Sequence, residues 1–393
     1  MRSTLAASKF VRPAITFRAR RSSRARRSEA GSWARRDIPV QTEWNDSPTQ
    51  HLAQRWSRHH LRLHRWLLQR PALLPDGASL LLAVSGGQDS MVLVGLLHDL
   101  QRLHHWKLQL WHGNHQLRAN AGEQASELAR WAAQQGIPLH MEVWREPEPT
   151  EAAARAWRYA ALAAAASSCG ASHVVTGHTA SDRAETLLLQ LARGSHRRGL
   201  ASLRPQRPLT AELTLVRPLL LFTRGETGEI HTQLGLPLWP DASNEDPRYS
   251  RNRLRQEVLP VLEQLHPGAS RRISGVAERL GQEQDSQQEL VELALTGLLA
   301  GPPAPPIALR RRDLVALQPA NQRQLLQHWL ARQGVSNLPA PQLDLLLSRL
   351  THGREPGSTD LRKGLRLQWD RQHLWLQQPS AGPPHRAEPP DSP

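Results

Sequence analysis

The sequence predicts an α/β protein in which a Rossmann-like parallel sheet carries helices on both faces and is followed by a mostly helical C-terminal region. Between residues 80 and 192, short apolar runs alternate with longer segments of helical spacing, a pattern typical of parallel sheets. The first apolar run, LLLAV, stops abruptly at a Gly-Gly turn that leads into a helical pattern. Beyond residue 220, helical spacing predominates as far as a final hairpin.

The elements of the sheet follow in chain order. Apolar residues at helical spacing predict a helix within residues 51–69, before the first strand. Strands are predicted at residues 80–84, 106–111, 137–143 and 173–176. The helices that follow them are predicted from residue 91 onward and over residues 121–135, 150–168 and 181–192.

The C-terminal region is predicted from the same signals. Helices are expected over residues 224–234, 249–265 and 270–300, with a turn at 239–244 before the second of them. The segment GPPAPP at 301–306 is a linker. Three short helices and a hairpin are expected after it, at residues 310–317, 321–333, 340–350 and 365–376.

Composition narrows the class of protein. A chain of 393 residues with 39% hydrophobic content can hold two or three domains. No stretch approaches the roughly 18 apolar residues that span a bilayer, so a soluble protein without membrane association is expected. Cys169 is the only cysteine, which excludes intrachain disulfides and a C-x-x-C motif and favours a structural thiol.

The formal net charge of +15 favours a polyanionic partner such as nucleic acid. Arginine dominates the basic residues, and its planar guanidinium suits bidentate contacts to phosphate. An arginine-rich genome is the alternative explanation for part of this charge.

Residues 1–45 form a separate, basic segment that is expected to be disordered. Residues 1–40 contain eleven basic and two acidic residues, with little hydrophobic periodicity. This composition fits a nucleic-acid-binding tail, an organelle transit peptide or an over-extended start site. We interpret the segment as a dispensable extension without a chemical role.

The turn after the first strand is the main candidate site. It consists of Ser85, Gly86, Gly87, Gln88, Asp89 and Ser90. Adjacent glycines and a following helix N-terminus direct backbone N–H groups at one point, which suits phosphate, and the Asp89 carboxylate can hold Mg²⁺. A βα turn without a ligand is the alternative. The chain contains no Walker A sequence and the turn is not G-x-G-x-x-G.

Polar clusters also follow the other three strands. They contain His112, Asn114 and His115 after the second strand, Arg155 and Arg158 after the third, and Asp182 and Glu185 after the fourth. Each cluster alone could be a solvated helix start. Ligands bind at the carboxyl ends of parallel strands, so together the clusters predict one shared site.

Two basic segments lie further along the chain. Arg193 precedes Gly194 and Ser195 in a loop, and Arg251, Asn252 and Arg255 open a predicted helix. Arg251 and Arg255 share one helical face. A solvated helix is the alternative to contact with phosphate or with a nucleotide.

This ordered set of motifs resembles the tRNA(Ile)-lysidine synthetase family of PP-loop ATP pyrophosphatases. The likeness runs from about residue 80 to residue 265 and is weaker through the C-terminal helices. The most discriminating stretch combines Asp241, Ser243 and Asn244 with Tyr249, Arg251, Asn252 and Arg255.

The resemblance implies an ATP-dependent ligase that forms a carbon–nitrogen bond. ATP adenylates O2 of the wobble cytidine, position 34, in an isoleucine tRNA with a CAU anticodon. Free L-lysine then attacks C2, and AMP and pyrophosphate are released as lysidine forms. ATP and Mg²⁺ are the implied cofactors, the tRNA and lysine are the partners, and a homodimer is compatible with the family.

The resemblance also implies residue roles. ATP would bind to Ser85, Gly86, Gly87, Gln88, Asp89, Ser90 and His112, with Mg²⁺ on Asp89. Lysine would bind to Asp182 and Glu185, which are catalytic together with Asp89, Arg155 and Arg158. Contacts to tRNA would come from Arg193, Arg251, Asn252 and Arg255.

The family pattern divides the chain into a PP-loop ATPase domain (46–222), a helical second part of the catalytic region (223–300), a small tRNA-binding domain (301–378) and a disordered tail (379–393). The expected location is the bacterial cytoplasm, or a plastid if residues 1–45 are a transit peptide. Three positions depart from the pattern: Gln116 replaces a glycine, Ser181 an aspartate and Arg183 a glutamine.

Three rival functions are weighed against this one. A sulfur-inserting tRNA thiolase would need cysteines, and the chain has one. A PP-loop amidotransferase or NAD synthetase would not need the basic C-terminal half. A non-catalytic tRNA-binding protein would not need the acids Asp89, Asp182 and Glu185.

Overall fold

A computed structural model describes residues 56–114, 121–145, 150–239, 248–302, 304–305, 307–335, 338–352, 355–361 and 364–377. Four predictions fall wholly or largely outside these ranges: the extension at 1–45, the residues 115–118, the turn at 240–244 and the tail after 379. Residues 51–393 form one compact unit.

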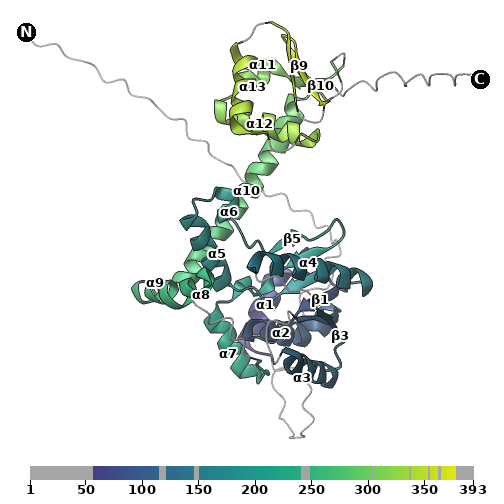
Figure 1. The fold of residues 1–393 in the computed structure, drawn as a ribbon, viewed down its shortest axis with the longest axis vertical. Helices are drawn as coiled ribbons and strands as arrows, with labels where there is room; N and C mark the ends of the chain where they lie inside the picture. Colours follow the sequence, from purple (N-terminus) through teal and green to yellow (C-terminus); the bar gives the residue numbers. More distant parts are fainter. Residues whose placement is uncertain are drawn as a thin grey trace, which may run out of the picture. The chain divides into compact units, whose positions relative to one another are not determined.

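A six-stranded sheet forms the centre of the N-terminal half (Figure 1). The strand order is β3-β2-β1-β4-β6-β5, and all neighbouring pairs are parallel except β5 with β6. The four predicted strands are present, whereas β5 and β6, of three residues each, were not predicted. The strands are β1 (Ser79–Ala83), β2 (Lys107–Asn114), β3 (Leu139–Val143), β4 (His173–Thr176), β5 (Gln206–Pro208) and β6 (Thr214–Val216).

Helices cover both faces of this sheet, as the sequence predicts. Leu80 and Leu82 of the central strand pack in one apolar cluster, and Leu81 packs in another on the opposite face. All three side chains are fully buried because β1 lies between two helical layers. The helices are α1 (Arg58–Leu68), α2 (Gln88–His104), α3 (Ala121–Gln134), α4 (Glu151–Ser168), α5 (Ala180–Ala192), α6 (Arg197–Leu200), η1 (Pro218–Leu221) and α7 (Arg224–Leu234).

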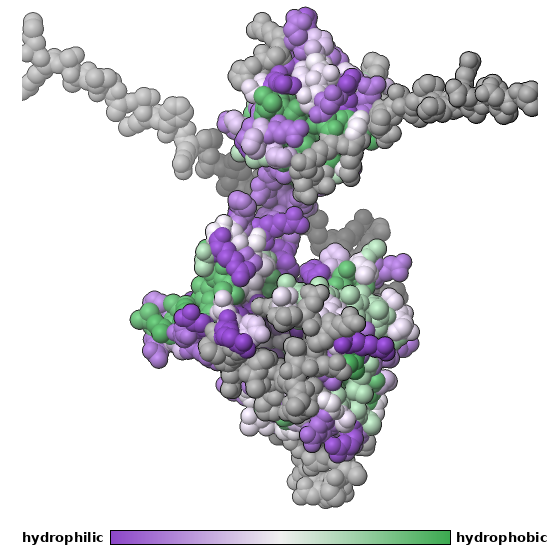
Figure 2. Space-filling model, in the orientation of Figure 1, coloured by the Kyte–Doolittle hydropathy of each residue, from purple (hydrophilic) through white to green (hydrophobic). Residues whose placement is uncertain are grey.

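The predicted helix at 249–265 is interrupted by a π-helical turn. It consists of α8 (Ser250–Arg253), the turn η3 (Leu254–Val258) and α9 (Leu259–Leu265). Pro260 supplies no N–H and crowds the carbonyl one turn earlier, which favours wider winding before it. Apolar side chains of this segment are exposed and form a patch over α9 (Figure 2), at Val258, Val261 and Leu265.

The long helix α10 (Ala269–Leu298) contributes to two separate cores. It begins after Gly268, whose φ of 84° suits glycine, and its first half packs against α5. Its last turns carry Val291, Leu295 and Leu298 into an apolar cluster of the C-terminal region.

The C-terminal region contains a sheet that the sequence predicted only in part. The strand order is β7-β10-β9-β8, with every pair antiparallel. The predicted hairpin corresponds to β9 and β10, and the flanking strands β7 and β8 were missed. The elements are β7 (Leu309–Arg310), α11 (Arg311–Val315), α12 (Pro319–Arg332), α13 (Ala340–His352), β8 (Gly357–Asp360), β9 (Arg366–Trp369) and β10 (His373–Gln377).

None of the helices within the described ranges is long and apolar enough to cross a membrane. Cys169 is half-buried at the end of α4, where its thiol lies 3.6 Å from the carbonyl oxygen of Ala166. This position fits the structural thiol that the sequence predicts.

Candidate functional site

The loop after β1 has the shape of an anion cradle. Gly86 has a φ of 84°, and Trp239 packs so closely that an added Cβ would lie 3.3 Å from its side chain. Helix α2 begins directly after Gly87, which provides no side-chain cap, so the first N–H groups of the helix can bind an anion.

The two serines shape this loop from within. The Ser85 hydroxyl donates to Ser90 Oγ at 3.2 Å, and the Ser90 hydroxyl donates to the Gly87 carbonyl at 2.8 Å. The Gly87 N–H donates to Ser85 Oγ at 3.3 Å. At the end of β2, a ring nitrogen of His112 lies 2.9 Å from the Val84 carbonyl oxygen, which places the imidazole beside the loop. Burial lowers the pKa of His112, so its neutral form is favoured.

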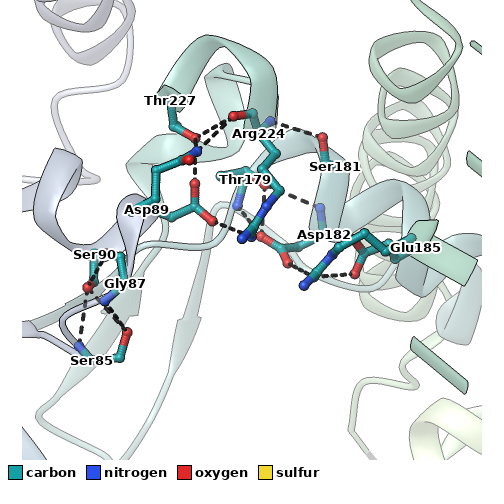
Figure 3. A network of polar contacts seen from close by, with 12 residues as sticks. Ser85, Gly87, Asp89, Ser90, Thr179, Ser181, Asp182, Glu185, Arg224 and Thr227 are labelled. Atoms are coloured by element: carbon teal, nitrogen blue, oxygen red, sulfur yellow. Dashed lines mark hydrogen bonds and ion pairs between the residues drawn. The ribbon is translucent and has the colours of Figure 1, made fainter. Parts of the chain in front are cut away.

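Asp89 points away from the loop and toward α7 (Figure 3). Its carboxylate accepts a hydrogen bond from Thr227 Oγ1 at 2.5 Å and from Arg224 Nη1 at 3.0 Å. Burial and the charge of Asp182 raise the pKa of Asp89, against the opposing effects of Arg224 and Thr227. Arg224 and Thr227 were not predicted as site residues, because neither lies in a recognised motif.

The Asp89 carboxylate is a suitable kind of ligand for Mg²⁺, but a bound ion would have to displace Thr227 or Arg224 from one of its oxygens. Mg²⁺ usually takes one or two carboxylates and completes its shell with waters and substrate phosphates. Among the described residues, no group of three or more His, Cys, Asp or Glu is placed to hold a metal, so phosphates would have to supply further ligands. Asp89 lies in the first turn of α2, next to the phosphate cradle.

The two predicted acids on α5 lie side by side, and a third residue joins them. Asp182 closes a capping box: its Oδ2 accepts from the Thr179 N–H at 2.8 Å, and its own N–H donates to Thr179 Oγ1. Glu185 is fully buried, and its two oxygens accept from Arg255 Nε at 2.7 Å and Nη2 at 2.9 Å. Arg255 Nη2 also donates to Asp182 at 3.3 Å.

Burial and the charge of the Arg255 guanidinium act in opposite directions on the pKa values of Asp182 and Glu185. Burial raises the pKa of Glu185, and hydrogen bonding from Arg255 only partly offsets this. Burial also opposes ionisation of Asp182, but hydrogen bonding from Thr179 and the charge of Arg255 lower its pKa. Burial lowers the pKa of His178 to about 3, so the imidazole is neutral near pH 7.

The structure explains two departures from the family pattern. Arg183 lies on the opposite side of α5 from the acids, where it is 2% exposed and donates to Glu278 of α10 at 3.2 Å. The Ser181 hydroxyl accepts from the Arg224 N–H at 3.0 Å and so ties α5 to the start of α7. Neither substitution displaces Asp182 or Glu185.

The predicted tRNA-binding residues occupy two different environments. Arg193 is exposed at the end of α5. Arg251, Asn252 and Arg255 are half-buried or buried and face the acid-bearing helix: Arg251 Nη2 donates to Thr186 Oγ1 at 2.9 Å. The opposite charges of the two segments are the sequence signal for this contact, but Arg255 and Glu185 lie 70 positions apart in the chain.

Both predicted arginines of α4, Arg155 and Arg158, are exposed. The Arg155 guanidinium lies 4.9 Å from the ring centre of Tyr159 and contributes to the low pKa of His178. Arg158 lies one turn further along the same helix. The structure brings Asp182, Glu185, Arg251 and Arg255 together.

Known proteins match this chain over most of its length. A family model described as a PP-loop domain matches residues 60–262. The tRNA(Ile)-lysidine synthase of Parasynechococcus marenigrum is 51% identical over 338 residues, which cover 84% of this chain and 98% of that protein. The corresponding enzyme of Prochlorococcus marinus is 39% identical, over 82% of this chain and 96% of its own.

A third relative agrees with these two. The tRNA(Ile)-lysidine synthase of a Synechococcus species is 48% identical over 303 residues, which cover 73% of this chain and 93% of that protein. The motifs at the carboxyl ends of β1, β2 and β4 lie within the PP-loop match. The chain belongs to the tRNA(Ile)-lysidine synthase family.

Proposed function

We propose that this protein ligates lysine to C2 of the wobble cytidine, position 34, of the isoleucine tRNA with a CAU anticodon. The observation that carries the proposal is the 51% identity along almost the whole length of a tRNA(Ile)-lysidine synthase. The carboxyl ends of the strands contribute a phosphate cradle and a pair of acids. This combination suits adenylation followed by attack of an amine that binds as an ammonium ion and then loses a proton.

The first step is adenylation of the base. O2 of the cytidine attacks the α-phosphorus of ATP, the bond to the β-phosphate breaks, and pyrophosphate leaves. The free N–H groups at the start of α2 face the phosphates and offset the charge that develops on the leaving group. Mg²⁺ held by Asp89, when bound, supplies further charge neutralisation on the phosphate oxygens.

The second step is attack by lysine. Its amine forms a bond to C2, the C2–O2 bond breaks, and O2 leaves as part of AMP. We propose that a lysine ammonium takes the position between Asp182 and Glu185 that the Arg255 guanidinium fills in this structure. Because burial raises the pKa of Glu185, this carboxylate is the better acceptor for the proton that the amine must lose.

We also propose where the partners act. The region 301–378 would bind the body of the tRNA, and Arg193, which is exposed, would contact it nearer to the site. The bacterial relatives favour the cytoplasm as the place of action. The thiolase alternative has no support from Cys169, which lies half-buried at the end of α4.

The test is transfer of labelled lysine to the tRNA in the presence of ATP and Mg²⁺. We expect one AMP per lysine transferred, and no transfer to the same tRNA with uridine at position 34. Asp182→Asn and Glu185→Gln should each raise the KM for lysine by about a hundredfold, since each removes a charged partner of the ammonium. Binding of ATP without any lysine transfer by the wild-type protein would refute the proposal.

A further inference from the structure

Three arginines from separate elements converge on one tyrosine of α4. The Arg155 guanidinium lies 4.9 Å from the ring centre of Tyr159, and the Arg207 guanidinium lies 4.8 Å from it. Burial raises the pKa of Tyr159, but the charges of Arg155 and Arg217 and hydrogen bonds from Arg217 and Arg207 lower it overall. We call Arg155, Tyr159, Arg207 and Arg217 the tyrosine–arginine cluster.

The positive charge of this cluster is not neutralised within the described part of the chain. No described carboxylate lies within 4.0 Å of Arg155, Arg207 or Arg217 in an ion pair. Arg217 is only 2% exposed; its Nη1 donates to the Arg204 carbonyl, and its buried Nε has no hydrogen-bond partner among the described residues. A buried guanidinium without a counter-charge is costly, so an external anion would relieve the cost.

The cluster borders the lysine site on the side away from the phosphate cradle. Arg217 directly follows β6, which pairs with β4, and β4 in turn pairs with the central strand β1. The cradle follows β1 and the acids follow β4, so β6 lies about two strand spacings, roughly 10 Å, from the strand of the cradle. Arg155 and Arg217 both lower the pKa of His178, which lies next to the acids.

Two arginines of the cluster are accessible to solvent. Arg155 is exposed, and Arg207 lies half-buried on the edge strand β5, so both guanidinium groups can reach a ligand in solvent. Tyr159 is half-buried and Arg217 is buried, and the tyrosine hydrogen bonds to both Arg207 and Arg217. Planar guanidinium groups bind the oxygens of a phosphate in bidentate fashion.

We propose that the tyrosine–arginine cluster binds a backbone phosphate of the tRNA next to the cytidine that is modified. The proposal rests on the proposed function. The phosphates of ATP are assigned to the cradle after β1, which leaves the tRNA backbone as the source of phosphate for the cluster. A lysine carboxylate carries the same single charge as a phosphodiester, so the test below also measures the KM for lysine. A phosphodiester beside the target base would fix the nucleotide within reach of both the adenylate and the lysine.

The test compares Arg207→Gln with Arg130→Gln. Arg130 is an exposed arginine of α3, so its loss changes the net charge equally without touching the cluster. We expect Arg207→Gln to weaken tRNA binding about tenfold and to lower the slope of log Kd against log salt by about one, with the KM values for ATP and lysine unchanged. Arg207→Lys should recover the salt slope but only part of the affinity for tRNA, since it restores the positive charge but not the bidentate hydrogen-bonding geometry of the guanidinium.

Tyr159→Phe gives a second measurement if Arg207→Gln does not fold. It keeps the ring and removes the hydroxyl that orients two of the arginines, so tRNA binding should weaken by a smaller factor of about three. The proposal is overturned if tRNA binding by the folded cluster variants equals that of Arg130→Gln. It is also overturned if the KM for ATP or for lysine rises while tRNA affinity stays unchanged, because the anion is then part of that substrate.

Failure of this proposal is distinguishable from failure of the proposed function. Lysine transfer by the wild-type protein tests the function without any variant. A wild-type enzyme that transfers lysine, with an Arg207→Gln variant that binds tRNA normally, would refute the phosphate site alone.

Discussion

At the residue scale, Arg255 determines how the acid pair is presented to a substrate. Its guanidinium makes a bidentate contact with Glu185 and a third hydrogen bond to Asp182. Two adjacent carboxylates without a cation would repel one another and favour protonation, so the charge of Arg255 favours their ionised forms. If lysine uses the same oxygens, its binding includes the free energy of displacing Arg255.

Replacing Arg255 should therefore tighten lysine binding in the absence of tRNA. We expect Arg255→Gln to lower the lysine Kd of the ATP-bound enzyme by about fivefold, because no competing guanidinium remains. The matched control is Arg253→Gln, an exposed arginine two residues away that pairs with Glu257. Isothermal titration calorimetry measures both; an unchanged or weaker lysine affinity in Arg255→Gln alone would contradict displacement.

At the element scale, Glu226 connects three helices through one carboxylate. It completes the capping box of α7 with Thr223 and accepts from Arg62 of α1 and Arg271 of α10. Burial opposes its ionisation, but the Thr223 N–H, Arg271 and Arg62 lower its pKa to about 2. Since this pKa lies below the ordinary 4.5, the stabilisation is fully present above pH 4.5 and is lost as the pH falls toward 2.

Glu226→Gln should destabilise the protein by about 2 to 3 kcal/mol at pH 7, because it removes a cap and two charged contacts. The difference from wild type should shrink as the pH falls from about 5 toward 3. Glu229→Gln is the control on the same helix: its partner Arg58 is exposed, so the expected effect is below about 0.5 kcal/mol. Urea unfolding at several pH values checks this, and a pH-independent difference would rule out the ionised carboxylate as the cause.

The elements that the sequence predicted are those in which the hydrophobic periodicity can be recognised. The strands β1 to β4 are bounded by turns and alternate with helices of eleven or more residues, so the alternation of strands and helices can be recognised in the sequence. The missed strands β5 to β8 have two to four residues each, too few to show alternation, and their pairing depends on partners distant in the chain. The π-helical turn at Leu254–Val258 was missed because helical periodicity does not register a local change in winding.

In the candidate site, too, the sequence predicted the residues that belong to local motifs and not their distant partners. Local motifs placed Ser85–Ser90, Asp182 and Glu185 at strand ends, because the Gly-Gly turn and the helix starts are encoded within a few residues. The partners Arg224 and Arg255 were not assigned to these acids, since such contacts join residues 135 and 70 positions apart. The packing of α7 against α2, and of the segment formed by α8 and the π-helical turn against α5, brings them together.

At the scale of the whole molecule, two apolar cores are joined by one helix. The first half of α10 packs against α5, the helix that carries the acids, and Arg183 binds Glu278 at this contact. The last turns of α10 insert Leu295 and Leu298 into the C-terminal core. A 30-residue helix is about 45 Å long, which supports the proposal that the C-terminal region binds parts of the tRNA distant from the reacting base.

The chain outside these cores is expected to be dispensable. The relative that is 51% identical aligns over 98% of its own length but only 84% of this chain, so part of this chain has no counterpart in it. The PP-loop match begins at residue 60. The N-terminus of helix α1 is capped by Ser57 and His60, which form a capping box that involves no residue before Ser57.

Deleting residues 1–45 should therefore leave lysine transfer within about twofold of the full chain and the melting temperature within about 2 °C. The control deletion, through residue 70, removes the buried Leu63 and Leu67 of α1 and should abolish folding. Steady-state kinetics and thermal melts measure both. A tenfold loss of tRNA affinity together with a shallower salt dependence in the first deletion would contradict dispensability, because it would show that the basic residues of the extension bind the tRNA backbone.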